Sequence, residues 1–370
     1  MPGIKAYTAD RIFTGEEWLS EKAIIVKENR IEDLVAISQL PASISLNTYP
    51  GSYIVPSFID LQIYGAYGKL LAVYPEPASL YQLRDYCLAG GAAHCLPTVA
   101  TNTRETFFRC IDAVNAYWQE GGKGILGLHL EGPWINPLKK GAHIISLIHP
   151  PVTEEVKAIL EYGRGVIKMI TLAPELCNQE VLDLLKADGI VISAGHSNAT
   201  YDEAMQGFGQ GISAVTHLYN AMSPLQHRAP GLVGAAMDHE QVMASIIPDG
   251  FHVDFAAIRI AKHVMKERLF VITDAVTETE KGYYPHQKAG NKYEAGGILS
   301  GSALTMNKAV QNLVERAGIA LPEALRMCSL YPARVMRMDH ELGRIRKGAL
   351  AAFTVMKHSF DVTQVFPVSG

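Results

Sequence analysis

The sequence lacks a long apolar run, has few cysteines and has no large excess of either charge. Its 370 residues include 33 Lys and Arg against 37 Asp and Glu, a formal net charge of −4. No stretch approaches the roughly 18 to 20 apolar residues that cross a bilayer, and the first residues lack the apolar core of a secretory signal. No run of Lys or Arg marks a nucleic-acid or membrane surface. We therefore expect a cytoplasmic protein that acts on a small molecule.

The 5 cysteines are scattered, odd in number and without a CxxC pair. This pattern does not match a disulfide framework, a zinc ribbon or a redox couple. We expect buried free thiols, which behave as small apolar side chains. The residues concerned are Cys87, Cys95, Cys110, Cys177 and Cys328.

Hydrophobic residues make up 48% of the chain, which is enough for a large core. Eight short apolar runs alternate with longer amphipathic stretches: IVPSFIDLQIYG, AAHCLPTVA, GILGLHLEG, VIKMITLAPE, GIVISAG, ISAVTHL, VMASIIPDG and LFVITDA. Parallel strands covered by helices need this alternation, so the predicted fold class is α/β, a (β/α)8 barrel. A doubly wound sheet is the alternative, although no GxGxxG follows the first run and reactive residues fall where runs end.

Both ends of the chain have the pattern of β structure. IKAYTADRIFT and KAIIVKENRIEDLV indicate strands near the N-terminus, and ELGRIRKGALAAFTVMKH indicates two short strands joined by a glycine turn. We expect these segments to pair, because chain termini often lie close together. Between the last barrel run and this segment we expect a loop at KGYYPHQKAGNKYEAGG and helices at TMNKAVQNLVERAG and PEALRMCSLYPARVM.

Three potential metal ligands end three apolar runs. Glu131 ends GLHLE, His196 follows ISAG and His217 lies in AVTHL. One carboxylate and two imidazoles suit Zn²⁺ and leave one coordination position open, as in catalytic zinc sites. Hydrogen bonding at strand ends without a metal is the alternative for both histidines. His129 shares a strand face with Glu131, as a fourth ligand or a packed imidazole.

Further polar residues follow the last two runs. Asp274 in VITDAVTE would lie at the barrel mouth, where it could take a proton from water and return it to a leaving group. A helix N-cap is its alternative role. Asp249 and His252 in PDGFHVD form another cluster, in which the aspartate could simply make an Asp-Gly turn.

These motifs resemble the amidohydrolase superfamily and, within it, the family of N-acetylglucosamine-6-phosphate deacetylases. The segments that carry the resemblance are PSFIDLQIYG, HLEGPWINPLKKGAH, SAGHSNATYDEA, THLYNAMSP, IIPDGFHVD, ITDA, LSGSALTM and SLYPARV. The resemblance implies a metal-dependent barrel over residues 55–338, a small β-sandwich from residues 1–54 and 339–370, and a homodimer. It also implies hydrolysis of N-acetylglucosamine 6-phosphate to glucosamine 6-phosphate and acetate.

The resemblance further implies roles for single residues. Glu131, His196 and His217 would hold one divalent metal ion, zinc. Asp274 would be the catalytic base and acid, and His143 would polarise the amide carbonyl. The residues implied to bind the sugar phosphate are Ala142, Asn220, Ala221, His252 and Arg228, the last reaching the site of the neighbouring subunit.

The first barrel run departs from the wider superfamily, in which a His-x-His pair holds a second metal. Here the sequence has Gln62-Ile63-Tyr64, and neither an amide nor a phenol replaces imidazole well as a ligand. We therefore expect a single metal ion, with Gln62 as a hydrogen-bonding group beside the substrate site. The segment that follows, YGAYGKLLAVYPEP, is bulkier than the glycine-rich segment usual in the family and bears on how strictly a 6-phosphate is required.

Two other functions are compatible with the same residues. One is an amidohydrolase that acts on a cyclic amide or on an acetamido sugar without phosphate, which would not need Arg228. The other is a non-catalytic barrel scaffold, which would be expected to lack a metal ligand or the proton-transfer residue; the sequence lacks neither.

Overall fold

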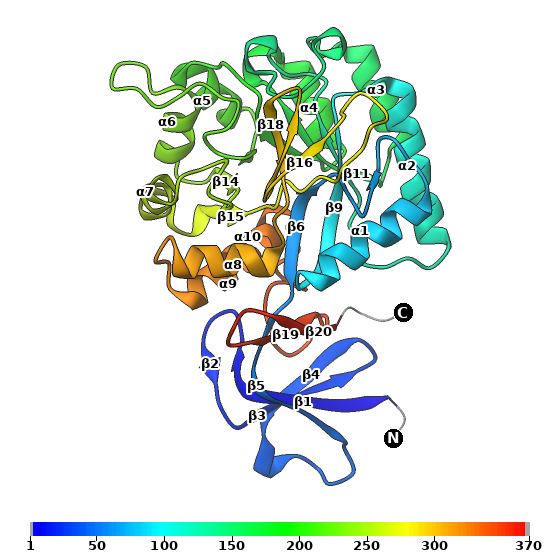
Figure 1. Ribbon diagram of the computed structural model, residues 1–370, viewed down its shortest axis with the longest axis vertical. Helices are drawn as coiled ribbons and strands as arrows, with labels where there is room; N and C mark the ends of the chain where they lie inside the picture. Colours follow the sequence, from blue (N-terminus) through cyan, green and yellow to red (C-terminus); the bar gives the residue numbers. More distant parts are fainter. Residues whose placement is uncertain (1–2, 367–370) are drawn as a thin grey trace.

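The computed structural model describes residues 3–366, and a parallel barrel forms its larger part (Figure 1). Eight strands make one sheet in the order β15-β14-β13-β12-β11-β10-β9-β6, and every neighbouring pair is parallel. Each strand lies within one of the eight predicted apolar runs, so the predicted fold class is confirmed. The strands are β6 (Phe58–Ile63), β9 (Ala92–Ala100), β10 (Leu128–Glu131), β11 (Ile167–Leu172), β12 (Val191–Ala194), β13 (Ala214–Val215), β14 (Met243–Ile246) and β15 (Leu269–Val271).

The barrel closes just beyond the ends of β6 and β15. Ile63 and Ala275 form a parallel bridge there. The backbone N–H of Asp274 donates to Gln62 O at 3.0 Å, and that of Tyr64 donates to Ala275 O at 2.9 Å. This closure brings the first barrel strand against the segment that carries Asp274, at the rim where all eight strands end.

Helices cover the outside of the barrel, and most of them bury one apolar face, whereas α6 is buried almost all round. In α4, for example, Val181, Leu182 and Leu185 are buried. Side chains cap several N-termini, as in α5, where Thr200 and Glu203 form a capping box. The helices are α1 (Pro77–Ala89), α2 (Arg104–Gln119), α3 (Thr153–Tyr162), α4 (Gln179–Ala187), α5 (Tyr201–Gly209), α6 (Gly231–Asp238), α7 (Phe255–Met265), α8 (Met306–Glu315), α9 (Leu321–Cys328) and α10 (Leu330–Val335).

Both ends of the chain form a second, sheet-rich part below the barrel in Figure 1. Its strands are β1 (Ile4–Phe13), β2 (Trp18–Leu19), β3 (Lys22–Lys27), β4 (Arg30–Ala36), β5 (Leu46–Pro56), β19 (Phe353–Lys357) and β20 (Val362–Phe366). They form one sheet in the order β20-β19-β5-β1-β3-β4, with β2 on β1. The antiparallel pairing of β19 with β5 confirms that the two ends meet. The exact limits of the two domains stay a prediction, and residues 1–2 and 367–370 lie outside the described range.

Two sequence-based expectations for the last eighty residues are wrong. Within ELGRIRKGALAAFTVMKH only Phe353–Lys357 is a strand, and its hairpin partner is β20. The stretch before it turns instead, with positive φ at Gly343 and Gly348. The single helix expected in PEALRMCSLYPARVM breaks at Ser329, because Pro332 has no N–H to donate to the carbonyl four residues earlier.

The loop expected after the barrel also has structure. It contains a small antiparallel sheet of β16 (Gln287–Ala289), β17 (Lys292–Ala295) and β18 (Ile298–Ser302). Two-residue turns with positive φ at Gly290 and at Gly296 and Gly297 join the strands, which is the glycine signal that the sequence prediction overlooked. A second short hairpin, β7 (Gly65–Ala66) with β8 (Lys69–Leu70), follows the first barrel strand.

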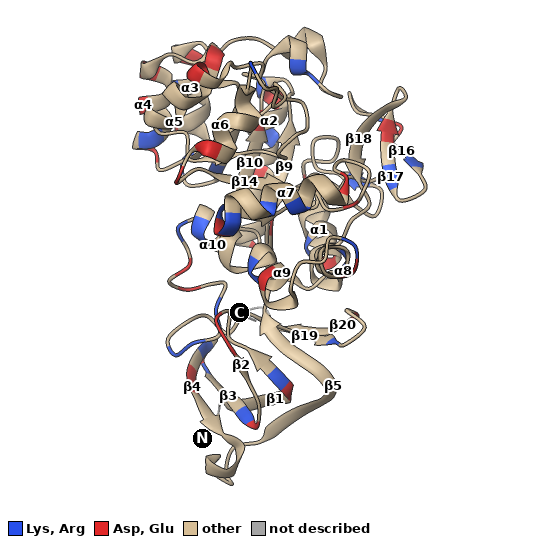
Figure 2. Cartoon of the chain, turned by 90° about the vertical axis from the view of Figure 1, so that its left-hand side faces the viewer, with Lys and Arg blue, Asp and Glu red and all other residues tan. Residues whose placement is uncertain are grey.

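Other expectations concern the surface and the thiols. Four of the five cysteines are buried, Cys177 is half-buried and all five are free, as predicted. Basic and acidic residues are interspersed on the side that Figure 2 shows. Among the described residues, no helix combines the length and the apolar character that a membrane crossing requires.

Candidate active site

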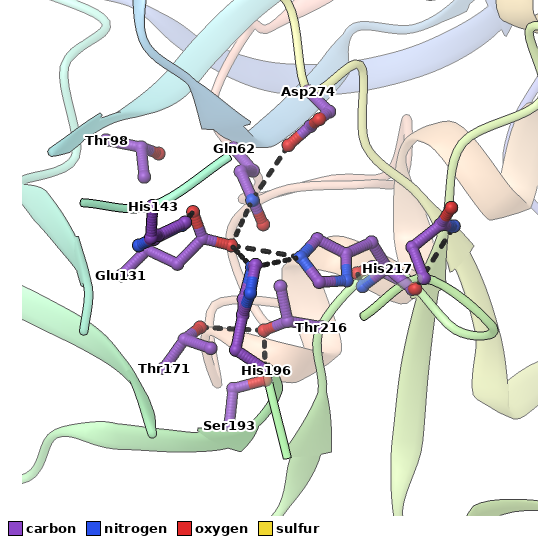
Figure 3. Close-up of polar contacts among 12 residues, drawn as sticks. Gln62, Thr98, Glu131, His143, Thr171, Ser193, His196, Thr216, His217 and Asp274 are labelled. Atoms are coloured by element: carbon purple, nitrogen blue, oxygen red, sulfur yellow. Dashed lines mark hydrogen bonds and ion pairs between the residues drawn. The ribbon is translucent and has the colours of Figure 1, made fainter. Parts of the chain in front are cut away.

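A cavity of about 170 Å³ opens at the carboxyl ends of the barrel strands. All five residues expected to carry chemistry line it, and Figure 3 shows their side chains converging. They are Glu131, His143, His196, His217 and Asp274. Four of the residues expected to contact the substrate line the same cavity, namely Ala142, Asn220, Ala221 and His252.

The three predicted metal ligands direct one atom each at a shared point. Glu131 Oε1 lies 3.0 Å from His217 Nε2 and 3.3 Å from His196 Nε2, and the two nitrogens are 3.1 Å apart. Two ligands at about 2.0–2.1 Å from a tetrahedral zinc ion lie roughly 3.3 Å from each other. The spacing of the three atoms therefore fits a shared metal ion, with one position left for another ligand.

The environment of His196 supports this fit. His196 Nδ1 lies 2.9 Å from the carbonyl oxygen of Lys139, so a proton on Nδ1 leaves the Nε2 lone pair facing the other ligands. His217 Nδ1 is buried and has no hydrogen-bond partner within residues 3–366. Burial raises the pKa of Glu131, but the charge of His196 and hydrogen bonds from the histidines outweigh this and hold its pKa well below the ordinary value.

His143 contacts the other oxygen of the same carboxylate. Its Nε2 lies 3.2 Å from Glu131 Oε2 and its Nδ1 lies 2.7 Å from Thr101 Oγ1. Ligand atoms of Glu131, His143 and His196 also lie within 4.8 Å of one another, so a different trio is conceivable on distance alone. The trio with His217 fits a metal better because its atoms are within 3.3 Å. Burial lowers the pKa of His143 to about 4, so its ring is neutral.

Asp274 lies across the cavity from the trio and is held by neutral and basic groups. Its Oδ1 accepts a hydrogen bond from Gln62 Nε2 at 2.9 Å, and its Oδ2 is 3.7 Å from His252 Nε2. His252 Nδ1 in turn lies 2.6 Å from Asp249 Oδ2, while Asp249 Oδ1 accepts the backbone N–H of His252. Asp249 thus makes the turn and also orients the imidazole. Removal from water raises the pKa of Asp274, which favours a proton-accepting role.

His129 is a packed imidazole. Its Nε2 lies 2.7 Å from Thr171 Oγ1 and its Nδ1 lies 3.2 Å from the Leu61 carbonyl, so both nitrogens are engaged away from the trio. A chain of hydroxyls continues from Thr171 through Thr216 to Ser193, at 2.7 and 2.6 Å (Figure 3). Burial lowers the pKa of His129 to about 4, in keeping with a neutral ring.

Gln62 and Arg228 are the two predicted site residues that do not line this cavity. The Gln62 amide lies behind the cavity wall, where it contacts Glu131 and Asp274. Arg228 is exposed in the segment between β13 and α6, which extends away from the barrel in Figure 1. It borders a separate hollow together with Asn198 and Thr200. Within one chain, therefore, the guanidinium is not part of the cavity.

Two features of the site were not predicted. Tyr64 lines the cavity, and its phenol contacts Glu131, although the sequence indicated only a poor metal ligand there. Backbone strain is the other feature, because five residues around the cavity have positive φ without being glycine: His196, His217, Tyr219, Ala221 and Asp274, from 38° to 79°. Such strain accumulates at functional sites, but it leaves no mark in the residue types.

Candidate metal ligands at the strand ends of an eight-stranded barrel point to the class of metal-dependent hydrolases, and comparison with known proteins agrees. The chain belongs to the amidohydrolase family, whose model matches residues 53–368. Residues 6–53 match the NagA composite domain. Together the two matches account for nearly the whole chain.

The most informative relatives are sugar-phosphate deacetylases. N-acetylglucosamine-6-phosphate deacetylase of Haemophilus influenzae is 33% identical over 95% of this chain and 94% of its own length. N-acetylgalactosamine-6-phosphate deacetylase of Escherichia coli O157:H7 is 30% identical over 97% and 96%. The crystal structure of N-acetylglucosamine-6-phosphate deacetylase from Pasteurella multocida superposes with a TM-score of 0.94 at 33% identity, covering 99% of this chain and 98% of that one.

A further similar structure contains the sugar phosphate. It is N-acetyl-D-glucosamine-6-phosphate deacetylase of Mycobacterium smegmatis, in a variant with one aspartate replaced by alanine and in complex with N-acetyl-D-glucosamine-6-phosphate. It superposes with a TM-score of 0.91 at 27% identity, over 99% of this chain and 98% of that one.

Proposed function

We propose that this protein is a metal-dependent deacetylase that hydrolyses N-acetylglucosamine 6-phosphate to glucosamine 6-phosphate and acetate in amino-sugar catabolism. The observation that carries the proposal is the convergence of Glu131, His196 and His217 on one point, with Asp274 in the same cavity. Membership of the amidohydrolase family and full-length similarity to deacetylases of this substrate support it.

The metal in the proposal is one divalent ion, zinc, held by Glu131, His196 and His217. An ion bound there supplies Lewis acidity at the amide carbonyl and lowers the pKa of the attacking water. A mixed set of one carboxylate and two imidazoles is typical of catalytic zinc. The hydrogen bonds that already occupy Glu131 Oε2 support a single ion.

Asp274 moves the proton. Its Oδ2 faces the cavity near His252, and its raised pKa makes the carboxylate a stronger base than a solvated aspartate. It takes a proton from the attacking water and then gives it to the sugar nitrogen, so that the amine leaves uncharged. His143 is neutral and therefore carries a single N–H. Its Nε2 contacts Glu131 Oε2 in the free protein, and on substrate binding it would donate instead to the carbonyl oxygen as negative charge develops there.

The sugar phosphate is bound by Ala142, Asn220, Ala221 and His252. Gln62 lies behind the cavity wall and holds Glu131 and Asp274 in place by hydrogen bonds. Arg228 completes the phosphate site of the neighbouring subunit in a homodimer, because a charged fork recognises phosphate and this one lies outside its own cavity. The compartment in this proposal is the cytoplasm, where amino-sugar phosphates arise.

A second candidate is deacetylation of N-acetylgalactosamine 6-phosphate. The specific observation in its favour is the 30% identity with the E. coli O157:H7 enzyme over 97% of this chain. The two substrates differ only in the configuration of one hydroxyl group, so the metal ligands and Asp274 serve both.

The experiment is an acetate-release assay on four sugars: N-acetylglucosamine and N-acetylgalactosamine, each with and without the 6-phosphate. We expect the highest kcat/KM for N-acetylglucosamine 6-phosphate, with activity lost on chelation and restored by zinc. A preference for the galactosamine epimer would favour the second candidate. Chelator-resistant turnover, or no acetate from any of the four, would contradict the proposal.

A further inference from the structure

Tyr64 forms a hydrogen bond with one carboxylate oxygen of Glu131 and leaves the other oxygen facing two histidines. The phenol O–H donates to Glu131 Oε2 at 2.5 Å, and His143 Nε2 contacts the same oxygen at 3.2 Å. The other oxygen, Oε1, faces the imidazoles of His196 and His217. Oε2 is therefore turned toward Tyr64 and His143, and Oε1 is the oxygen that faces the point shared with His196 and His217.

The phenol is itself fixed on all sides. The ring of Tyr64 is 9% exposed and packs with Leu70, Val276, Tyr284 and Tyr293. Its backbone N–H donates to Ala275 O at 2.9 Å, at the seam where the barrel closes. The phenol oxygen therefore has little freedom to move, and the carboxylate that it holds has little freedom to rotate.

Gln62 strengthens the same arrangement from behind. Its two amide hydrogens face three acceptors: Tyr64 Oη at 2.7 Å, Asp274 Oδ1 at 2.9 Å and Glu131 Oε1 at 3.0 Å. The bond to the phenol oxygen orients the single Tyr64 proton toward Glu131. When Oε1 binds a cation, the two amide hydrogens are left with two acceptors, the phenol and Asp274, and the network is fully satisfied.

We propose that Tyr64 is a positioning residue that makes Glu131 a one-oxygen ligand and so limits the site to one metal ion in a four-coordinate geometry. The inference rests on the proposed metal-dependent function and adds a residue to it. Groups that orient a metal ligand through a hydrogen bond typically change metal affinity by roughly 10- to 100-fold when removed. In their absence a carboxylate can rotate and bind through both oxygens.

The test compares Tyr64→Phe with Tyr284→Phe. Tyr284 is a matched control because it lines the same cavity and is also buried, at 4% exposure against 9% for Tyr64. Its O–H donates to the Thr101 carbonyl at 2.6 Å and does not contact Glu131. Zinc affinity is measured by competition with a chromophoric chelator. We expect the zinc Kd of Tyr64→Phe to rise by roughly 10- to 100-fold and that of Tyr284→Phe to stay within about threefold of wild type.

Cobalt substitution gives a readout that a general loss of packing does not change. We expect intense d–d absorption from Co²⁺ in the wild type and in Tyr284→Phe, as four-coordinate sites show, and weaker bands in Tyr64→Phe as Glu131 becomes bidentate. Unchanged zinc affinity together with an unchanged cobalt spectrum in Tyr64→Phe would overturn the inference.

The wild-type protein provides a second test in case Tyr64→Phe does not fold. It should bind one tight equivalent of Co²⁺ with the four-coordinate spectrum, and a second tight equivalent or weak six-coordinate bands would refute the role of Tyr64. The acetate-release assay is independent of this outcome. A wild type that deacetylates but binds two ions defeats only the inference, whereas a wild type without activity defeats the proposed function.

Discussion

Strands β11 and β14 in the body of the barrel bury apolar side chains such as Ile170 and Ile246, whereas the segments just beyond the strand ends bury carboxylates and imidazoles. The two regions also differ in backbone. Within residues 3–366, none of the barrel strands contains a non-glycine residue of positive φ, while the segments after β12, β13 and β15 contain five. We call the strands the body of the barrel and the segments at their carboxyl ends the rim. The two regions are only a few residues apart along the chain.

The difference shows how one barrel separates stability from chemistry. Burying apolar area stabilises the body by about 25 cal/mol per Å². The rim lowers the stability of the fold. Each non-glycine residue with a left-handed backbone conformation costs roughly 1–3 kcal/mol, and each buried charge needs partners. A strained, polar rim is therefore possible only on a body that is well packed, and substitutions in the two regions should have opposite signatures.

The largest effect is expected at the rim, from Asp274→Asn. Acid–base catalysis contributes about 10²- to 10⁴-fold, and in the proposed mechanism Asp274 is both base and acid, so turnover should fall by about 10³-fold or more. The thermal midpoint should stay the same or rise, since the change removes a buried carboxylate whose pKa is raised. Initial rates and thermal unfolding measure the two effects.

Asp188→Asn is the matched control, because Asp188 is an exposed aspartate that ends α4. It should leave the rate and the midpoint unchanged. Turnover near that of the wild type in metal-loaded Asp274→Asn would remove Asp274 from the mechanism.

The body should show the reverse signature in Phe107→Ala. Phe107 lies on α2, is 1% exposed and belongs to the main core, so the cavity left behind should cost about 3–5 kcal/mol of unfolding free energy. At temperatures where the variant is folded, kcat/KM should remain within about twofold of wild type. Urea unfolding followed by circular dichroism and steady-state kinetics provide the measurements.

The neighbouring residue provides the control. Phe108 is only partly buried and stacks on Tyr162, so Phe108→Ala should cost less than Phe107→Ala. A fall in kcat/KM well beyond twofold in folded Phe107→Ala would show that packing in the barrel body is coupled to catalysis at the rim.

Asp60 tests where the boundary between body and rim lies, because it is a carboxylate within the barrel body. It is 1% exposed on β6 and accepts hydrogen bonds from the backbone and hydroxyl of Thr273. Burial raises its pKa from 3.8 to about 7. The folded state therefore holds a proton that the unfolded state releases, and the contribution of this group to stability is present below about pH 4 and is lost as the pH rises through about 7.

We expect this loss to amount to roughly 2 kcal/mol between pH 5 and pH 8, and to be absent in Asp60→Asn. The measurement is the difference in unfolding free energy between variant and wild type at the two pH values, with Asp188→Asn as the control. The difference should shift in favour of the variant as the pH rises. A difference that does not change with pH would mean that Asp60 is ionised throughout this range.

The smallest effect is expected farthest from the cavity, in Arg228→Ala. Charge-assisted hydrogen bonds to phosphate contribute a few kcal/mol at most, so KM for N-acetylglucosamine 6-phosphate should rise roughly 10- to 30-fold while KM for the unphosphorylated sugar stays unchanged. Arg164→Ala, another exposed arginine, should change neither.

Mixing two variants tests whether Arg228 acts across subunits. A heterodimer of Arg228→Ala with Asp274→Asn would contain one site with both residues intact, so mixing should restore low-KM activity. Equal effects of Arg228→Ala on both sugars, or no restoration on mixing, would contradict the assignment.

The barrel body was the part most accessible from the sequence. Each barrel strand falls in a predicted apolar run, because strands covered on both faces are predominantly apolar. Helix α8 lies in its predicted segment for the same kind of reason, an amphipathic pattern of period 3.6. The C-terminal hairpin and the β16–β18 sheet were not predicted correctly, since short strands at a surface depend on turn geometry more than on pattern.

The rim was only partly accessible. Glu131, His196, His217 and Asp274 could be singled out because polar residues directly after apolar runs collect at one end of a barrel. The contact of Tyr64 with Glu131 could not, since it depends on the position of β6 beside the segment after β15, 3.0 Å from Asp274 N to Gln62 O. Asp249 likewise needed coordinates to show that one oxygen makes the turn and the other holds His252.

The sequence by itself determined the number of barrel strands, the order of the polar residues at the strand ends and the chemical type of the candidate ligand set, because these follow from local patterns of burial and from residue chemistry. Only the tertiary structure decided which atoms of those residues meet, which carboxylate oxygen faces the imidazoles and that Arg228 lies outside its own cavity. The physical reason is that barrel closure and left-handed backbone at strand ends set angstrom-scale directions, and such directions depend on packing between segments far apart in the chain.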